Sequence, residues 1–204
     1  MYTPKPYKND EIQDIKEFIR DHSFGILLNQ TGNKIVGTHI PLEIDKDEFG
    51  KDILFGHISK ANPQADALKN ESEVLAIFNG PHSYISSSWY KKEDAPTWNY
   101  IAVHIYGKIR LIDDKTLMTC LDKLVNKYEK KSEHPVSIKG MSKETLSQMQ
   151  GILGFYIEIN NIESTYKLSQ NKNDKDYKNI IANLQKNKNP KPKTVVDYMK
   201  LLRP

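Results

Sequence analysis

The feature that most restricts the fold is a long alternating stretch at residues 97–112, TWNYIAVHIYGKIRLI. Successive side chains of a β-strand point to opposite faces, so a period of two in the sequence separates one face from the other. The stretch is also rich in β-branched and aromatic residues, which strands favour. We expect one face to hold Ile101, Val103, Ile105, Ile109 and Leu111, and the other to hold Trp98, Tyr100, Ala102, His104 and Tyr106.

Several other stretches have strand character and short connections. Residues 23–29 and 34–44, joined by the turn TGN, predict a β-hairpin. Further strands are expected at 52–58, 73–80, 83–88 and 155–163. Six or seven strands with mostly antiparallel neighbours predict a small closed barrel of the β-rich α+β class. The strands do not alternate regularly with helices, which argues against a doubly wound sheet.

Helices are expected before and between the strands. A first helix follows a cap at Asn9 or Asp10 and would place four apolar residues on one face: Ile12, Ile15, Phe18 and Ile19. A short helix is predicted in ANPQADALKN (61–70), and a longer one over 114–131. Another helix is expected to begin at Ser142 and to stop at Gly151.

The carboxyl-terminal part is expected to be helical twice, at 174–187 and at 194–203. We therefore expect a barrel domain over residues 1–170 and a helical extension over 171–204. The basic run KNKNPKPK at 186–193 lies between the two helices. We interpret it as a solvated, proline-broken linker rather than as a phosphate-binding patch.

The composition is ordinary for a soluble domain. The chain has 204 residues, of which 38% are hydrophobic and 27% charged, and its net charge is +4. No apolar run approaches the roughly 20 residues that a membrane helix needs, and no apolar stretch follows the first lysines as in a secretory signal. The single cysteine excludes an intrachain disulfide. We expect a cytoplasmic protein without membrane contact.

The run from Phe78 to Lys108 holds both tryptophans and is the most unusual part of the sequence. Its rings lie next to a polar connection that is broken by Pro96. Rings beside hydroxyls, amides and imidazoles suit a flat ligand with polar edges. An aromatic hairpin packed for stability explains the same residues equally well.

Common catalytic templates are missing from the sequence. It contains no GxGxxG, GxxxxGK[ST], HExxH or GxSxG pattern. The histidines are spread over different elements, so their spacing predicts no metal site. Cys120 lies at an apolar position of the 114–131 helix, and we expect a buried core thiol.

The segment GHISKANPQ (56–64) carries a more specific signal. A strand ends there, and Ser59, Lys60 and Asn62 come just before a helix that starts near Pro63. A hydroxyl, an ammonium group and free backbone N–H groups at a helix start form a natural phosphate site. An ordinary helix cap beside a solvated lysine is the alternative explanation.

Five motifs follow one another along the chain: THIPLE (38–43), GHISKANPQ, FNGPHSYISSSWY (78–90), APTWNYIAVHIYGK (95–108) and KLSQN (167–171). Together they resemble the PaiB family of flavin-binding proteins, often described as FMN-binding negative transcriptional regulators. The resemblance covers about residues 1–185. It implies a six-stranded antiparallel Greek-key split β-barrel with peripheral helices, like that of the pyridoxamine phosphate oxidases. It also implies a homodimer with FMN in the cleft between the subunits.

The resemblance further implies a set of cofactor-binding residues in this sequence. Thr38, His39 and Ile40 would flank the flavin ring, Ser59 and Lys60 would hold the phosphate, and His57 and Asn62 would lie nearby. Trp98 and Asn99 would close the site from the partner subunit, with Lys167 and Gln170 as further candidates. The oxidases usually carry two basic residues in the phosphate segment, whereas here Ala61 follows Lys60.

Three functions remain open at this point. The first is a flavin-binding regulator or sensor of the PaiB type, or a flavin-dependent oxidoreductase. The second is a regulator that contacts DNA itself, for which the sequence offers no helix-turn-helix pattern and only a modest basic excess. The third is a haem-binding or haem-degrading split-barrel protein, although no motif singles out an axial ligand.

Overall fold

The computed structural model describes residues 1–187 and 190–203, and it leaves the side chains of 190–192 undescribed. Residues 188–189 of the predicted linker at 186–193 lie outside the described residues, and a helix begins at Pro190, so the second half of the predicted linker is helical. The chain forms two compact units, and each is described by itself below. Unit 1 consists of residues 1–18, 78–104 and 163–204, and unit 2 consists of residues 19–77 and 105–162. The predicted division at residue 170 stays a prediction.

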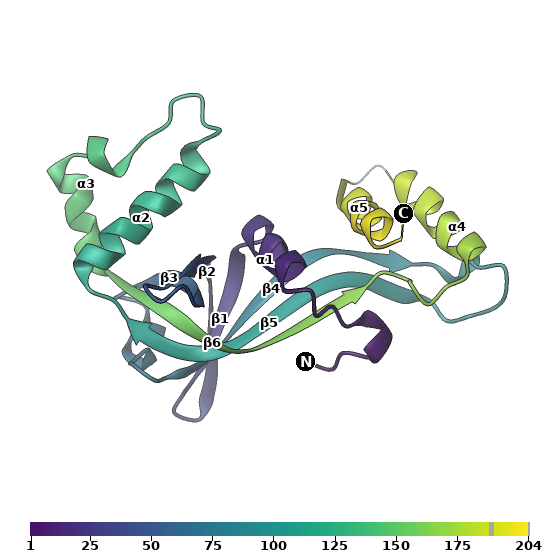
Figure 1. The fold of residues 1–204 in the computed structure, drawn as a ribbon, viewed down its shortest axis with the longest axis horizontal. Helices are drawn as coiled ribbons and strands as arrows, with labels where there is room; N and C mark the ends of the chain where they lie inside the picture. Colours follow the sequence, from purple (N-terminus) through teal and green to yellow (C-terminus); the bar gives the residue numbers. More distant parts are fainter. Residues whose placement is uncertain (188–189, 204) are drawn as a thin grey trace. The chain divides into compact units, whose positions relative to one another are not determined.

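Six strands form a closed antiparallel barrel, which confirms the expected fold class (Figure 1). Their order is β1-β2-β3-β6-β5-β4, and β1 closes the barrel by pairing with β4 as well as with β2. Neighbours that are distant in the sequence, such as β3 and β6, give the arrangement its Greek-key character. The strands are β1 (Phe24–Thr31), β2 (Lys34–Lys46), β3 (Asp52–Ser59), β4 (Glu73–Ile85), β5 (Thr97–Leu111) and β6 (Ile152–Lys167).

The predicted hairpin is confirmed as β1 and β2, joined by a turn in which Gly32 has a φ of 57°. Glycine suits this turn because other residues rarely adopt a positive φ. Leu27 pairs with Thr38, and Gly25 pairs with Ile40, so these residues share one face of the hairpin. Leu27 is fully buried, which identifies that face as the interior of the barrel.

The alternation predicted for β5 is confirmed. The aliphatic face is buried, with Ile101, Val103, Ile105 and Ile109 each at most 1% exposed. On the opposite face Trp98 is 54% exposed, whereas the smaller Ala102 is buried. Gly107 also lies in β5, and an added Cβ there would come within 2.3 Å of the Glu158 carbonyl oxygen. The absence of a side chain lets the backbone of β6 approach closely at this point.

Two of the predicted strand boundaries are wrong. The stretches 73–80 and 83–88 form one strand, β4, which continues through Gly80 and Pro81. The residues of β4 that pair with β1 end at Ile77, so Pro81 lies beyond this pairing. The N–H that proline lacks is therefore not needed for a hydrogen bond to β1. An added Cβ at Gly80 would come within 2.5 Å of the Phe18 ring, so that ring packs directly on the strand. The last strand, β6, extends to Lys167 instead of ending at residue 163.

Helices of unit 2 cover part of the barrel. The predicted helix at 114–131 is α2 (Asp114–Glu129), and its side chains Leu117, Cys120 and Leu121 pack with Phe55 of β3 in a buried cluster. Ser142 caps a helix as predicted, but α3 (Lys143–Ser147) is short and continues as the 3-10 helix η5 (Gln148–Gly151). The remaining 3-10 helices of this unit are η2 (Pro63–Ala67) and η4 (Ile138–Gly140). The helix η2 takes the place of the short helix expected at 61–70.

Unit 1 has its own apolar core. It contains α4 (Asp174–Gln185) and α5 (Pro190–Leu202), which lie side by side in Figure 1. The Tyr177 hydroxyl of α4 donates to the Met199 carbonyl of α5 at 2.7 Å. The buried side chains of these helices include Ile180, Leu184, Val195 and Val196. The unit also contains the 3-10 helices η1 (Lys5–Tyr7) and η3 (Ser87–Trp89).

The first helix, α1 (Ile12–Asp21), begins in unit 1 and ends in unit 2. Its apolar face is buried at Ile15, Phe18 and Ile19 as expected, but Ile12 is 47% exposed. The Asn9 side chain accepts from the Glu11 N–H at 2.9 Å, but α1 begins at Ile12 and the Glu11 carbonyl accepts from the Ile15 N–H, so the cap predicted at Asn9 or Asp10 was placed too early in the chain. In the part of the chain that the structure describes, no helix has the length and apolar character to cross a bilayer.

Candidate functional site

The turn after β3 brings several of the predicted site residues together. The Ser59 carbonyl accepts from the Asn62 N–H at 3.0 Å, and the Ser59 hydroxyl accepts from the Ala61 N–H at 3.2 Å. The Asn62 side chain caps η2 by accepting from the Gln64 N–H at 2.9 Å. Ser59 and Lys60 are exposed. A hydroxyl and an ammonium group thus lie next to a capped turn, open to a ligand.

The backbone N–H and the ammonium group of Lys60 are both hydrogen-bonded, but no carboxylate in the described part of the chain neutralises its charge. Its N–H donates to the Gly151 carbonyl at 2.8 Å, and its Nζ donates to the Gln150 carbonyl at 2.7 Å. No carboxylate pairs with this ammonium group among the described residues. A lysine ammonium has three donors, so two remain available for an anion.

A buried polar network connects this turn to β1 and β2. The Thr38 hydroxyl donates to Gln64 Oε1 at 2.5 Å and accepts from Asn62 Nδ2 at 3.0 Å. Gln64 Nε2 donates to the Leu27 carbonyl at 3.1 Å and to Asn29 Oδ1 at 2.7 Å. Gln64 is only 3% exposed. The network fixes Thr38 and Asn62 relative to each other, because a buried amide with all these partners has little freedom to move.

Gln64 and Asn29 were not predicted as site residues. Gln64 follows Pro63 in the motif ANPQ, and its type alone gave no reason to expect burial, since glutamine is mostly exposed in proteins. Asn29 lies on the same face of β1 as the buried Leu27, two residues away. A polar residue at an inward position of a strand is the signal that could have found Asn29.

His57 is half-buried in β3, and burial lowers its pKa below 6.5. Its Nδ1 is buried and has no hydrogen-bond partner within the described structure. The ring stacks on Phe55, with 6.1 Å between ring centroids, and a period of two places Ser59 on the same face of the strand. An unpartnered buried nitrogen is a group that a bound ligand can satisfy.

The other predicted residues of β2 differ in their surroundings. His39 is exposed on the outer face, where its ring centroid lies 6.2 Å from that of Phe24. Ile40 points into the barrel and is 8% exposed. Thr38 and Ile40 therefore share the inner face, whereas His39 lies on the outer one.

Two of the remaining predicted residues come from β5 in unit 1. Trp98 is exposed and forms an aromatic group with His82 and Tyr84, with centroid distances of 6.1 and 6.0 Å. Asn99 is fully buried, and its side-chain oxygen accepts from the Ser169 hydroxyl at 2.9 Å. Two neighbouring positions of β5 thus place the Trp98 ring in solvent and the Asn99 amide in the interior.

The last two predicted residues lie in the motif KLSQN, also in unit 1. The amide of Gln170 is bonded within its own turn, to the Leu168 N–H at 2.7 Å and to the Tyr166 carbonyl at 2.6 Å. The Lys167 Nζ donates to the Thr97 hydroxyl at 2.5 Å.

The structure gathers the predicted residues into two sets. Thr38, Ser59, Lys60 and Asn62 lie together in unit 2, where hydrogen bonds of the turn and of the Gln64 network join them. The residues from β5 and KLSQN belong to unit 1.

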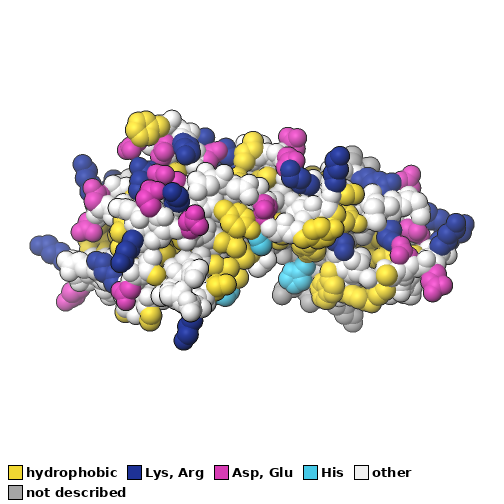
Figure 2. Space-filling view, turned by 90° about the horizontal axis from the view of Figure 1, so that it is seen from below, with side chains coloured by type: hydrophobic (Ala, Val, Ile, Leu, Met, Phe, Trp, Pro, Cys, Tyr) yellow, Lys and Arg dark blue, Asp and Glu magenta, His cyan; other side chains and the backbone are white. Residues whose placement is uncertain are grey.

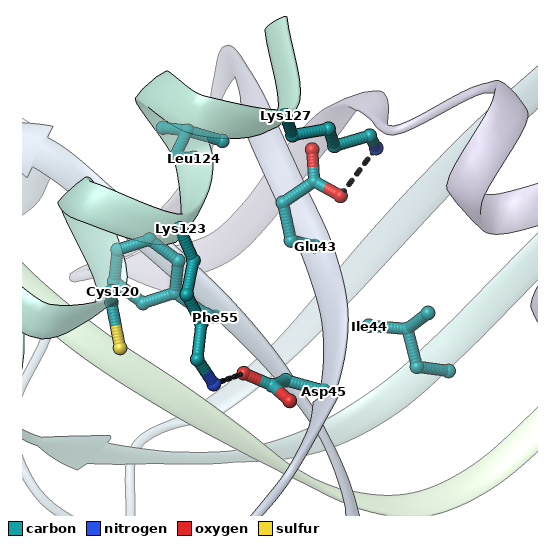
Figure 3. Close-up of a pocket in the computed structure, with 8 residues that line it drawn as sticks. All are labelled: Glu43, Ile44, Asp45, Phe55, Cys120, Lys123, Leu124 and Lys127. Atoms are coloured by element: carbon teal, nitrogen blue, oxygen red, sulfur yellow. Dashed lines mark hydrogen bonds and ion pairs between the residues drawn. The ribbon is translucent and has the colours of Figure 1, made fainter. Parts of the chain in front are cut away.

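A further pocket of about 190 Å³ lies beside α2 (Figure 3). Two ion pairs flank it, Lys123 with Asp45 at 2.6 Å and Lys127 with Glu43 at 2.7 Å. Cys120 lines this pocket but is only 4% exposed, and burial raises the pKa of its thiol. Each lysine is already neutralised by a carboxylate, so this pocket offers no free charge to a ligand. The buried core thiol predicted for Cys120 is confirmed.

Comparison with known proteins decides the family. A sequence model described as "Putative FMN-binding domain" matches residues 1–161. The chain belongs to this family. It is 40% identical over 200 residues to the protease synthase and sporulation protein PAI 2 of Bacillus subtilis, a match that covers 98% of this chain and 96% of the relative. The predicted membership of the PaiB family is confirmed.

Solved structures agree on the fold. The FAD- and haem-binding protein of Mycobacterium smegmatis superimposes with a TM-score of 0.62 at 13% identity, covering 79% of this chain and 73% of that one. The flavocytochrome Anf3 of Azotobacter vinelandii gives a TM-score of 0.52 at 16% identity, covering 81% of this chain and 72% of that one. At such low identity these likenesses show the fold alone.

Family membership makes a flavin the cofactor of this protein. The turn after β3 fits the phosphate end of FMN, because Lys60 has no acidic partner among the described residues and the preceding residue, Ser59, is also exposed. The unpartnered Nδ1 of His57 provides one more polar group that a ligand can satisfy. The residues present therefore fit a phosphorylated flavin.

Proposed function

We propose that the protein binds FMN through the turn after β3 and acts as a flavin-dependent regulator or sensor of the PaiB type. The observation that carries the proposal is the ammonium group of Lys60, which has no carboxylate partner among the described residues and belongs to the same turn as the exposed Ser59. A phosphate placed there would gain charge-assisted hydrogen bonds, which are stronger than neutral ones.

Each residue of the site then has a role. Lys60 and Ser59 bind the phosphate, and the Gln64 network holds Thr38 in position beside the ligand. His57, kept neutral by burial, which lowers its pKa, offers Nδ1 to a polar atom of the ligand. Bound FMN supplies a group that accepts or donates one or two electrons. Trp98, Asn99, Lys167 and Gln170 stay predictions for the partner-subunit side of the site.

A visible spectrum of the purified protein separates the remaining functions. Flavin bands support the proposed function, whereas a Soret band supports haem binding, the alternative suggested by the names of two structural neighbours. Turnover of bound flavin by a reductant and an acceptor would favour the oxidoreductase. Direct DNA contact is the weaker route to regulation, because the sequence offers no helix-turn-helix pattern and only a modest basic excess.

The substitution Lys60→Ala tests the site. Loss of a charge-assisted hydrogen bond costs about 1.5–3 kcal/mol, so FMN should bind roughly ten- to a hundred-fold more weakly, measured by quenching of flavin fluorescence. Riboflavin lacks the phosphate and should bind the variant and the parent alike. Lys34→Ala, an exposed lysine of β2 outside the turn, is the matched control. Unchanged FMN affinity in Lys60→Ala would remove Lys60 from the site.

We also propose a homodimer, which the outer face of the β2–β1–β4 sheet in unit 2 supports. Cross-strand pairs place Ile26 against Ile77 and Leu28 against Leu75 on this face. At its ends Phe24 is 66% and Ile35 is 79% exposed. Figure 2 shows hydrophobic side chains, in yellow, exposed on the surface of the molecule. An apolar face of this kind is typical of an interface, and a second copy of the chain covers it symmetrically.

A charge on this face should weaken the dimer. Ile35→Lys would place an ammonium group in the apolar contact, so the mass measured by light scattering at micromolar concentration should fall toward that of a monomer. Phe49→Lys is the control, because Phe49 is 85% exposed in the turn between β2 and β3. A parent protein that is monomeric at this concentration would disprove the proposed dimer.

A further inference from the structure

A polar pocket of about 210 Å³ lies wholly within unit 1. Its wall includes the side chains of Lys167, Lys172, Asp94, Thr97 and Asn171. Pockets that enclose a drug-sized ligand usually measure about 300–1,000 Å³. The volume therefore suits a small group rather than a whole flavin.

Lys167 brings an unneutralised charge to this pocket. Its Nζ donates to the Thr97 hydroxyl at 2.5 Å and lies 5.8 Å from the centroid of the Tyr7 ring. No carboxylate pairs with it in the described part of the chain. Two of its three donors remain available, and the electron-rich face of Tyr7 does not neutralise the charge.

Lys172 already binds an oxyanion, since it forms an ion pair with Asp94. The Lys172 side chain is 14% exposed and lies 4.1 Å from the centroid of the Tyr90 ring, whereas the Asp94 side chain is 56% exposed. The lysine is thus enclosed by its surroundings, while the aspartate reaches it from the solvent side. An incoming oxyanion can replace Asp94 without leaving a buried acid unpaired.

The backbone between the two lysines is fixed. Ser169 has a φ of 61°, a conformation that side chains rarely adopt and that persists only where the surroundings impose it. Its hydroxyl donates to Asn99, which is fully buried, and the Gln170 side chain bonds two backbone groups of the same turn. These contacts hold the turn between the two lysines in one conformation.

We propose that this pocket binds the carboxylate or phosphate group of a small molecule, with Lys167 as its principal ligand and Lys172 joining it when Asp94 moves aside. The pocket is distinct from the flavin-phosphate turn, whose residues belong to unit 2, because every residue that lines it belongs to unit 1. Lys167 is also a candidate for the partner-subunit side of the flavin site, so the experiment includes FMN binding. The shared chemistry is that of an oxyanion with two or three oxygens that accept hydrogen bonds from ammonium groups.

An NMR titration of the full-length protein tests the proposal. Inorganic phosphate is added in one series and acetate in another, at constant ionic strength maintained with sodium chloride. We expect the amide signals of Thr97 and Asn171 to shift and saturate. The series that saturates at the lower concentration identifies the preferred oxyanion. Shifts that do not saturate with either anion would overturn the proposal.

Three variants assign the binding to the pocket. Lys167→Ala should raise the dissociation constant about ten-fold or more, because it removes a charge-assisted bond. Asp94→Asn frees Lys172 at an exposed position and should lower the dissociation constant several-fold. Lys178→Ala, an exposed lysine of α4 outside the pocket, should leave it unchanged.

The same variants separate this site from the flavin site. If Lys167→Ala binds FMN as the parent does but loses the oxyanion, the pocket is a separate site. If Asp94→Asn and Lys167→Ala titrate like the parent, the proposal is wrong. If FMN displaces phosphate from the pocket and Lys167→Ala weakens both equally, the pocket belongs to the flavin site and the proposed second function is overturned.

Discussion

Replacing Gln64 by leucine tests the buried network that positions Thr38. The substitution keeps a similar volume but removes the acceptor of the Thr38 hydroxyl and the donor to Asn29 Oδ1 and to the Leu27 carbonyl. Thr38 retains the bond from Asn62, and its hydroxyl can rotate, so the cost at Thr38 is small. Asn29 is 6% exposed, and its oxygen would be left without this partner.

An unsatisfied buried polar group costs about 1–3 kcal/mol. The Asn29 oxygen would bear this cost in full, and the Thr38 hydroxyl and the Leu27 carbonyl would bear part of it. We therefore expect Gln64→Leu to lower the free energy of unfolding by about 2–3 kcal/mol. Domains of this kind are stable by about 5–15 kcal/mol, so the protein should still fold. The midpoint of urea unfolding, measured at one protein concentration, reports the difference.

Gln13→Leu is the matched control. Gln13 lies exposed on α1, where its side chain donates to the Glu17 carboxylate at 3.0 Å, so its loss should change stability by no more than about 0.5 kcal/mol. The FMN affinity of Gln64→Leu should also fall, because Thr38 loses its fixed position. A Gln64→Leu protein as stable as the Gln13→Leu protein would show that the network does not hold the turn in place.

Two further predictions concern single groups. Burial lowers the pKa of His57 in the folded state, so the contribution of neutral His57 to stability is present above pH 6.5 and is lost as the pH falls from 6.5 to the lowered value. Urea unfolding of His57→Gln should therefore show a smaller loss of stability between pH 7 and pH 5 than unfolding of the parent. An identical pH dependence of the two proteins would contradict this prediction. Burial also raises the pKa of the Cys120 thiol, so the reactive thiolate is scarce in the folded protein. Labelling of Cys120 with a maleimide should therefore be slow in buffer and fast in urea. Rapid labelling of the folded protein would show instead that the thiol is accessible.

Much of the fold could be predicted because it depends on local patterns. The alternation in β5 and the hairpin turn at Gly32 each depend on a few neighbouring residues. The errors arose where distant contacts decide the outcome. The strand β4 continues past Gly80, where the Phe18 ring occupies the space that a side chain would fill, and no pattern around Gly80 indicates that contact.

The end of β6 shows the same limit. From the sequence, the last strand was expected to span residues 155–163. In the structure Thr165 is fully buried, its hydroxyl lies 2.8 Å from that of Thr3, and its backbone bridges to Lys8. The partners of Thr165 come from the other end of the chain, so the local sequence could not indicate them.

The candidate site was predictable only in part. Ser59, Lys60 and Asn62 are adjacent in one turn, and their types indicated a phosphate site before the fold was known. Gln64 was missed because its importance depends on Asn29 and Thr38, which come from two other strands.

The pairing of Thr3 with Thr165 also bears on how the protein is made. A ribosome adds roughly 5–20 residues per second, so the amino-terminal segment waits on the order of 10–30 s for its partner strand to be synthesised. Unit 1 is assembled from three separate stretches of the chain, the last of which reaches the carboxyl end. During that interval the buried side chains of residues 1–18 are without their partners from β6, and a chaperone that shields apolar segments has its longest opportunity to bind there.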